Sequence, residues 1–100
     1  MSFSQKCYHL LRQVPPGQVT TYKDIAEALG SKAYRAVGQA MKNNPHAPQV
    51  PCHRVVHSNG RVGGFVGGTN KKISLLRSEG ICIEKERIIN INKYKYSFRK

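Results

Sequence analysis

Apolar residues recur at helical spacing near the start of the chain. Within residues 3–13, Cys7, Leu10 and Leu11 occur at helical spacing, and Phe3 precedes them. Residues on one face of a helix recur every three or four positions, so this segment is predicted to be a helix. The two prolines and the glycine of VPPGQV (14–19) should end it, because proline lacks the amide donor and glycine allows a turn.

A second helix is predicted after Thr21. Thr21 is suited to the N-cap, and Asp24 stands three residues later as an acidic variant of the capping box. Ile25 and Leu29 lie on one face of this helix, and Gly30 is suited to the residue just past its end.

A third helix is predicted after Ser31, which we expect to cap it. Its expected buried stripe follows helical periodicity and consists of Ala33, Ala36, Val37, Ala40 and Met41. Its expected outer face is basic and amide-bearing and carries Lys32, Arg35, Gln39 and Lys42. Two helices joined by a tight turn, the second with such a face, indicate a helix-turn-helix, although a merely solvated charged face is the alternative.

The second half of the chain mixes short elements. Residues 43–51 form a proline-rich loop, a turn is predicted at 58–60, and the glycines of 63–68 predict a loop that allows close backbone approach. Residues 70–80 are a predicted helix, and 81–98 alternate well enough for one or two strands. We therefore expect one domain over residues 1–100, mainly α with small β elements and winged-helix-like, containing a DNA-binding helix-turn-helix.

The charge indicates the kind of partner. Seventeen lysines and arginines against five acids give a formal net charge of +12 on 100 residues. This excess predicts a polyanionic partner, with nucleic acid as the leading candidate. An anionic membrane surface is the alternative, but no long basic amphipathic helix supports it. With no candidate membrane span and no signal pattern, we expect a soluble, monomeric protein in the cytoplasm, associated with the nucleoid if the source is prokaryotic.

Cys52, in VPCHRVV (50–56), has three possible roles. A structural zinc needs four protein ligands, and neither Cys7 nor Cys82 brings a second ligand nearby, so we expect no metal. A plain core thiol is common, but prolines and charged neighbours make an unsuitable apolar environment. A nucleophile fits best, since cations and a histidine favour the thiolate. His53 is the candidate base and Glu79 the candidate group that orients it.

Five colinear blocks resemble the O6-alkylguanine-DNA alkyltransferases, also called methylated-DNA–protein-cysteine methyltransferases. They are PPGQVTTYKDIA, AYRAVGQAMKNNP, VPCHRVV, SNGRVGGFVGG and LLRSEG, and together they cover roughly residues 5–83, leaving 84–100 as a basic tail. The resemblance implies direct reversal of base damage without a cofactor. The target nucleotide is rotated out of the duplex, and the alkyl group of O6-alkylguanine, or of O4-alkylthymine, moves irreversibly to a cysteine of the protein.

The resemblance also assigns roles to residues. Cys52 matches the alkyl acceptor, His53 the residue that takes the thiol proton through a water, and Glu79 the acid that orients it. Asn44 matches a residue that braces the active-site turn. These four are the expected catalytic residues.

The expected partner is double-stranded DNA containing alkylated guanine. Arg35 matches the finger that fills the gap left by the flipped base, and Tyr22 matches a tyrosine that contacts this base. The recognition helix of the family enters the minor groove, and its expected contacts here are Lys32, Ala33, Ala36 and Gln39. The expected base pocket consists of Tyr22, Val55, Phe65 and Val66.

The chain departs from the family in several places. The N-terminal domain of larger members has no counterpart here, so we expect the catalytic domain alone. Phe65 and Val66 stand where many members have Tyr and Ser, which removes two hydroxyl groups. The tail NKYKYSFRK (92–100) is similar to those of alkyltransferase-like proteins, which bind the same lesions but lack the cysteine. A lesion-binding protein without transfer is therefore one alternative, and a basic winged-helix module without chemistry is another.

Overall fold

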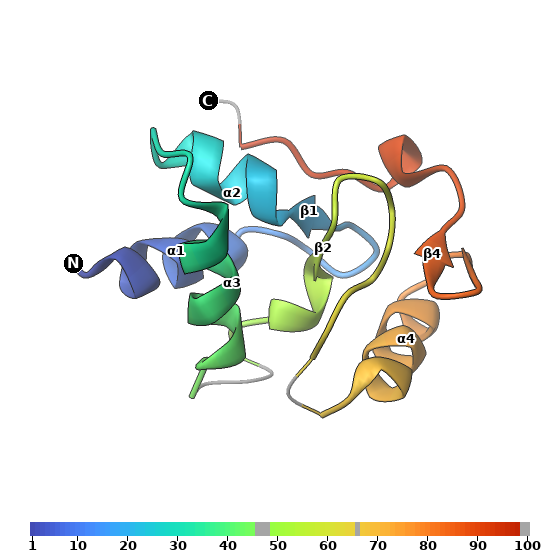
Figure 1. The fold of residues 1–100 in the computed structure, drawn as a ribbon. Helices are drawn as coiled ribbons and strands as arrows, with labels where there is room; N and C mark the ends of the chain where they lie inside the picture. Colours follow the sequence, from blue (N-terminus) through green and yellow to red (C-terminus); the bar gives the residue numbers. More distant parts are fainter. Residues whose placement is uncertain (46–48, 66, 99–100) are drawn as a thin grey trace.

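The structure is a computed structural model, and it describes residues 1–45, 49–65 and 67–98. Three helices pack together in the first half of the chain: α1 (Phe3–Leu11), α2 (Tyr22–Ala28) and α3 (Tyr34–Lys42). Figure 1 shows α3 in front of α1, with α2 above them. The predicted helix pair is therefore present, and the first helix ends two residues before the predicted boundary.

The caps explain where α2 begins and ends. The Thr21 hydroxyl accepts a hydrogen bond from the Asp24 amide at 2.9 Å, as the sequence predicted. Such a cap contributes about 1 kcal/mol to helix stability. Gly30 has a φ of +70°, a left-handed conformation that glycine adopts readily, and it ends the helix.

A short parallel pair of strands joins the helices to the segment that contains Cys52. Strand β1 (Thr20–Thr21) lies beside β2 (Val55–Val56), with Thr20 opposite Val55. The 3₁₀ helix η1 (Cys52–Arg54) comes directly before β2. The pairing therefore places η1 close to the start of α2, at the centre of Figure 1.

The second half forms a smaller unit. Helix α4 (Thr69–Ser78) is followed by the antiparallel strands β3 (Ile83–Glu84) and β4 (Arg87–Ile88) and by the 3₁₀ helix η2 (Ile91–Lys93). The C-terminal segment then runs back toward α2 (Figure 1). There Lys95 forms an isolated parallel β-bridge with Val19, the residue before β1. The mainly helical fold with small β elements is confirmed.

The core is divided between the two units. One buried cluster lies among α1, α2, α3 and η1 and includes Cys7, Leu11, Ile25, Val37 and Cys52. The other lies under α4 and the C-terminal hairpin and includes Val19, Val56, Leu76 and Ile88. Strand β2 contributes to both, with Val55 in the first cluster and Val56 in the second, so it joins the two units.

The prediction for α3 was partly wrong. Val37, Ala40 and Met41 are buried, but Ala33 and Ala36 are exposed. Ser31 does not cap the helix, because its hydroxyl accepts from the Ala33 amide before the helix begins at Tyr34. The late start leaves the first turn outside the core, so its small residues face solvent.

Candidate active site and nucleic-acid interface

Cys52 begins η1 and is only 4% exposed. The bend that leads into η1 is held by Asn44, whose side-chain amide donates to the Val50 carbonyl at 2.9 Å. Asn44 is itself buried, at the end of α3. The structure therefore places Asn44 where it braces the turn before the cysteine, and Cys52 beside the core.

His53 and Glu79 meet across the two units. His53 Nε2 lies 2.8 Å from Glu79 Oε2, although 25 residues separate them in the sequence. Arg54 donates to both oxygens of the same carboxylate, at 3.0 and 2.7 Å, and also to the Val14 carbonyl at 3.0 Å. This bidentate pairing fixes the carboxylate in plane and orientation. Glu79 is thus held by Arg54 while it holds the imidazole of His53.

The electrostatics favour a neutral imidazole. Burial lowers the pKa of His53, and the weaker opposing effect of Glu79 does not restore it. Burial also acts to raise the pKa of Glu79, but hydrogen bonds from Arg54 and His53 outweigh it and lower that pKa. Because an ionised carboxylate only accepts hydrogen bonds, Nε2 of His53 carries the hydrogen. Nδ1 is then the nitrogen that can accept a proton.

Cys52 opens onto a cavity of about 840 Å³. The cavity is lined by residues from α2, α3, η1 and the segment after β2, namely Tyr22, Tyr34, Arg35, Gly38, Met41, Lys42, Cys52, His57, Gly64 and Phe65. The Tyr22 and His57 ring centroids are 5.0 Å apart, and the Phe65 ring stands edge-on to His53 at 6.4 Å. The cavity thus brings together a thiol, aromatic side chains and two cations, an arrangement that suits a flat heterocycle.

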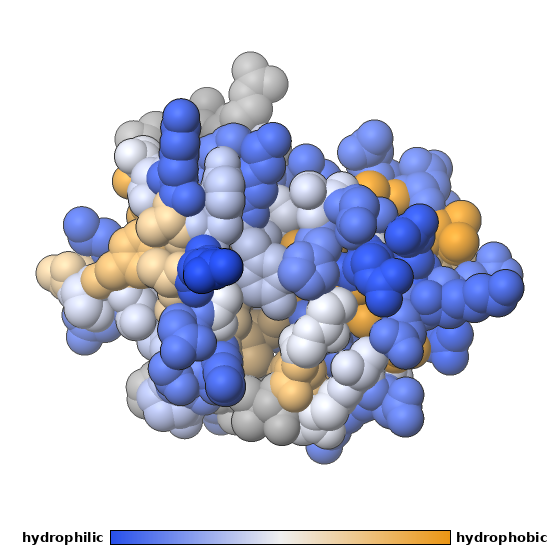
Figure 2. All heavy atoms as spheres, viewed as in Figure 1, coloured by the Kyte–Doolittle hydropathy of each residue, from blue (hydrophilic) through white to orange (hydrophobic). Residues whose placement is uncertain are grey.

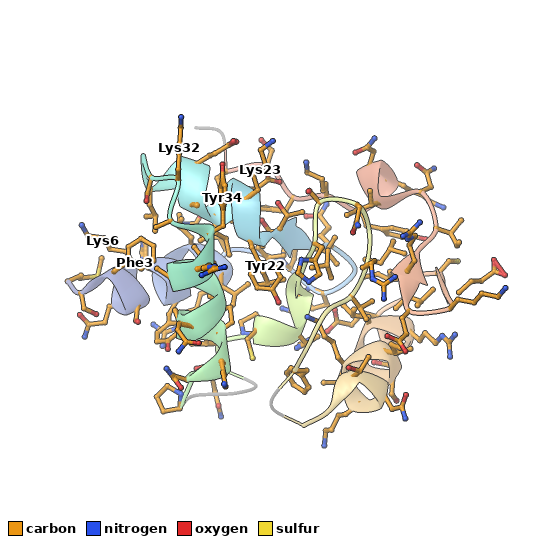
Figure 3. All side chains as sticks on the ribbon, in the orientation of Figure 1. Phe3, Lys6, Tyr22, Lys23, Lys32 and Tyr34 are labelled. Carbon is orange, nitrogen blue, oxygen red and sulfur yellow. The ribbon has the colours of Figure 1, made fainter. Side chains whose placement is uncertain are left out.

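The exposed side of α3 adjoins this cavity. Lys32 and Ala33, just before α3, and Arg35, Ala36 and Gln39 on it are all exposed. Of these residues only Arg35 lines the cavity. Figure 3 shows Lys23, Lys32 and Tyr34 over α2 and α3, with Tyr22 lower on the same face. Much of this face is hydrophilic in Figure 2. Small residues beside cations would let a nucleic-acid backbone approach α3 closely.

Of the four expected pocket residues, only some are found in the lining of the cavity. Val55 is fully buried in the core cluster of the first unit and does not line the cavity, because β2 pairs with β1 and directs it inward. Its carbonyl still reaches the site, as the acceptor of a hydrogen bond from Lys72. Val66 lies outside the described residues. Tyr22 and Phe65 line the cavity as expected.

Sequence reasoning missed Arg54, His57 and Lys72 as parts of the site. Lys72 had a readable signal, because Lys72, Leu76 and Glu79 follow one another at i, i+4 and i+7 and share a helical stripe. Because Lys72 shares this stripe with a buried leucine and with the candidate acid, the spacing predicts that its side chain faces the core. Arg54 and His57 had no comparable signal, since both follow from how distant segments pack.

Other site types are not found in the described part of the chain. No group of three or more His, Cys, Asp or Glu side chains there could hold a metal ion. Within the same residues, no helix is long and apolar enough to span a membrane. All three cysteines are free thiols.

Known proteins resemble this chain in sequence. The family model for the DNA-binding domain of 6-O-methylguanine DNA methyltransferase matches residues 2–81. A methylated-DNA–protein-cysteine methyltransferase of Metallosphaera sedula is 48% identical over 83 residues, which cover 83% of this chain and 52% of that protein. A bifunctional methyltransferase/endonuclease of Picrophilus torridus is 43% identical over 91 residues, or 90% of this chain and 30% of that protein. The chain thus spans about half the length of these relatives or less.

The fold also has solved counterparts. The crystal structure of S. pombe Atl1 in complex with damaged DNA containing O6-carboxymethylguanine superposes with a TM-score of 0.84 at 32% identity. The match covers 95% of this chain and 94% of that chain.

Proposed function

The chain belongs to the 6-O-methylguanine DNA methyltransferase family, and we propose that it repairs DNA by moving the alkyl group of O6-alkylguanine to Cys52. The observation that carries the proposal is that Cys52 lines the same cavity as Arg35 and Tyr22, while His53, the next residue in η1, is paired with Glu79. A cavity large enough to admit a base, a thiol and a proton acceptor are the parts that alkyl transfer requires.

The proposed reaction is a single displacement. His53 takes the thiol proton at Nδ1, through a water, and Glu79 stabilises the imidazolium that forms. The thiolate sulfur then bonds to the alkyl carbon while the bond from that carbon to O6 breaks, and the electron pair stays on O6. The proton from the thiol ends on the purine, which leaves guanine and a thioether at Cys52. Because the thioether does not revert, each molecule reacts once.

Base extrusion is the proposed task of the α3 face. The alkylated carbon inside a duplex cannot reach the sulfur of a cysteine that is only 4% exposed, so the nucleotide must leave the stack. Arg35 is exposed at the mouth of the cavity, where it would fill the gap left in the duplex. Tyr22 and Phe65 would contact the extruded base, and Lys32, Ala33, Ala36 and Gln39 would contact the DNA around it.

The experiment that tests the proposal follows the alkyl group. The protein is incubated with a duplex oligonucleotide containing O6-methylguanine and digested for mass spectrometry. We expect one added methyl group on the Cys52 peptide and none on the peptide of the exposed Cys82, which serves as the internal control. The Cys52→Ala variant should bind the same duplex but leave its methyl group in place. Demethylation of the duplex by Cys52→Ala would refute the proposal.

A second candidate function is lesion binding without transfer. It is favoured by the match to Atl1, which covers nearly the whole of both chains. The presence of Cys52 in the cavity favours transfer instead. Two results together would establish this second function. The protein would bind the methylated duplex more tightly than an unmodified duplex, and its Cys52 peptide would remain unmodified.

A further inference from the structure

Lys72 is a fully buried lysine in the wall of the site. It stands on α4, and its side chain has no solvent exposure. Its ammonium donates to the Val55 carbonyl at 2.7 Å and to the Gly64 carbonyl at 3.1 Å. It also lies 5.9 Å from the centre of the Tyr22 ring. One cation therefore contacts β2, the segment after β2 that lines the cavity (Gly64 and Phe65; below, the cavity-lining segment) and α2.

No carboxylate pairs with this ammonium in the described part of the chain. Glu79 pairs with Arg54 and His53, and Asp24 pairs with Lys95. The three remaining acids of the five are exposed: Glu27, Glu84 and Glu86. A buried charge without an opposite charge costs several kcal/mol, and burial accordingly lowers the pKa of Lys72 to about 8. At neutral pH the group still keeps most of its charge.

As a thiolate, Cys52 would supply a negative charge at this site. It lines the cavity together with Gly64, one of the two carbonyl partners of Lys72, and it stands three residues before the other. A negative charge on Cys52 acts to raise the pKa of Lys72, against the larger effect of burial. The two groups therefore interact electrostatically within the site.

The other groups that face Lys72 do not provide the same interaction. Burial and the nearby ammonium keep the pKa values of His53 and His57 below their ordinary range, so both imidazoles are neutral at pH 7. Burial raises the pKa of Tyr22, which stays a neutral phenol. Arg54 is neutralised by Glu79. Arg35 and Lys42 also line the cavity, but both are exposed, so solvent screens their charges. Lys72 is thus the buried cation that could balance a thiolate.

We propose that Lys72 is a positioning residue whose ammonium is the counter-ion of the Cys52 thiolate and ties the cavity-lining segment at Gly64 to β2. The inference rests on the proposed function only in taking the thiolate as the reactive form. Lys72 keeps its proton throughout, since the thiol proton goes to His53. Its effect on the sulfur is electrostatic.

The test measures thiolate formation without DNA. Iodoacetamide alkylation of the Cys52 peptide is followed by mass spectrometry from pH 5 to 10 in the wild type and in Lys72→Met, Lys72→Arg and Lys71→Met. The methionine variant keeps the length of the side chain but removes its charge, and Lys71 is the adjacent exposed lysine. We expect Lys72→Met to move the half-maximal rate upward by about one pH unit, with an unchanged plateau and a rate about tenfold lower at pH 7.

The control variants separate charge from packing. Lys72→Arg should restore most of the wild-type profile, and Lys71→Met should not change it. An unchanged profile in Lys72→Met, or an equal loss of rate at every pH, would overturn the proposal. Because iodoacetamide needs no base pocket, this result does not depend on whether the protein repairs DNA.

A reciprocal measurement decides the case if Lys72→Met does not fold. The titration of Lys72 is followed by carbon NMR of labelled lysine in the wild type and in Cys52→Ala. Coupling is mutual, so removal of the thiol should lower the titration midpoint of Lys72. An identical midpoint in the two proteins would overturn the proposal.

Discussion

His53 Nε2 and Glu79 Oε2 lie 2.8 Å apart, although one residue belongs to η1 and the other follows α4. The contact crosses the boundary between the two core clusters. It exists because β2 packs both toward the helices and toward α4, and because Arg54 fixes the carboxylate from its other side. The proposed base is therefore assembled by the fold as a whole.

Glu79→Gln should slow alkyl transfer by about a hundredfold, because a neutral amide no longer stabilises the imidazolium of His53. Affinity for the duplex should stay within about twofold, since Glu79 is not on the α3 face. Single-turnover transfer from a labelled O6-methylguanine duplex measures the rate, and a binding titration measures the affinity. The control is Glu84→Gln, which removes an exposed carboxylate. An unchanged rate in Glu79→Gln would exclude the proposed role of the acid.

The local elements of this site could be predicted from the sequence, because their signals are short-range. The Thr21 cap, the glycine that ends α2 and the turn before Arg61 each depend on neighbouring residues, and the structure has all three. The stripe of α3 was predicted less well. Periodicity assigns Ala33 and Ala36 to the buried side, but the helix begins too late for its first turn to reach the core.

The charged contacts of the site depend on tertiary packing. Nothing local indicates that Arg54 pairs with Glu79, or that the Lys72 ammonium reaches the carbonyls of Val55 and Gly64. Lysine side chains are generally exposed, so the sequence alone predicts an exposed Lys72. Its burial depends on carbonyls that only the folded chain brings to the ammonium. The residues matched through the family blocks were easier to identify, because the blocks preserve their order.

Arg35→Ala should impair transfer from duplex DNA at least tenfold more than reaction with a free O6-alkylguanine base, because only the duplex requires extrusion. Both rates are measured at saturating substrate, so that a loss of affinity does not enter the comparison. Lys32→Ala removes an exposed charge from the same face without touching the cavity. It should weaken duplex binding but leave the ratio of the two rates unchanged. Equal losses on duplex and free base in Arg35→Ala would contradict the finger role.

Gly63→Ala should disturb the cavity, because Gly63 has a φ of +75° and an added Cβ would lie 2.8 Å from His57 Nε2. We expect a loss of about 1 kcal/mol or more in the free energy of unfolding and a displaced His57 ring, visible as changed Tyr22 and His57 NMR shifts. Gly64→Ala is the matched control, since nothing lies within 4 Å of its added Cβ. Similar stability of the two variants would show that the contact of Gly63 with His57 is not restrictive.

The pH dependence of stability should reveal the buried charge of Lys72. Its folded pKa is about 8, against an ordinary value of 10.5, so the unfolded chain binds more protons between these values. Stability must then rise with pH across this window, because deprotonation removes the cost of the buried cation. The gain should reach at most about 3 kcal/mol.

Measurements in a Cys52→Ala background isolate this effect, since no thiolate then contributes charge. Urea unfolding at pH 7.5 and pH 10 gives the free energy of unfolding with lysine and with methionine at position 72. The protein with methionine should lack the rise in the free energy of unfolding between these pH values. The other titrating groups are the same in both proteins, so their contributions cancel when the two rises are subtracted. Replacement of the exposed Lys71 by methionine should leave the rise intact. A rise of equal size with lysine and with methionine would mean that the ammonium of Lys72 is not held in a desolvated site. The carbonyls of Val55 and Gly64 would then compensate its burial completely.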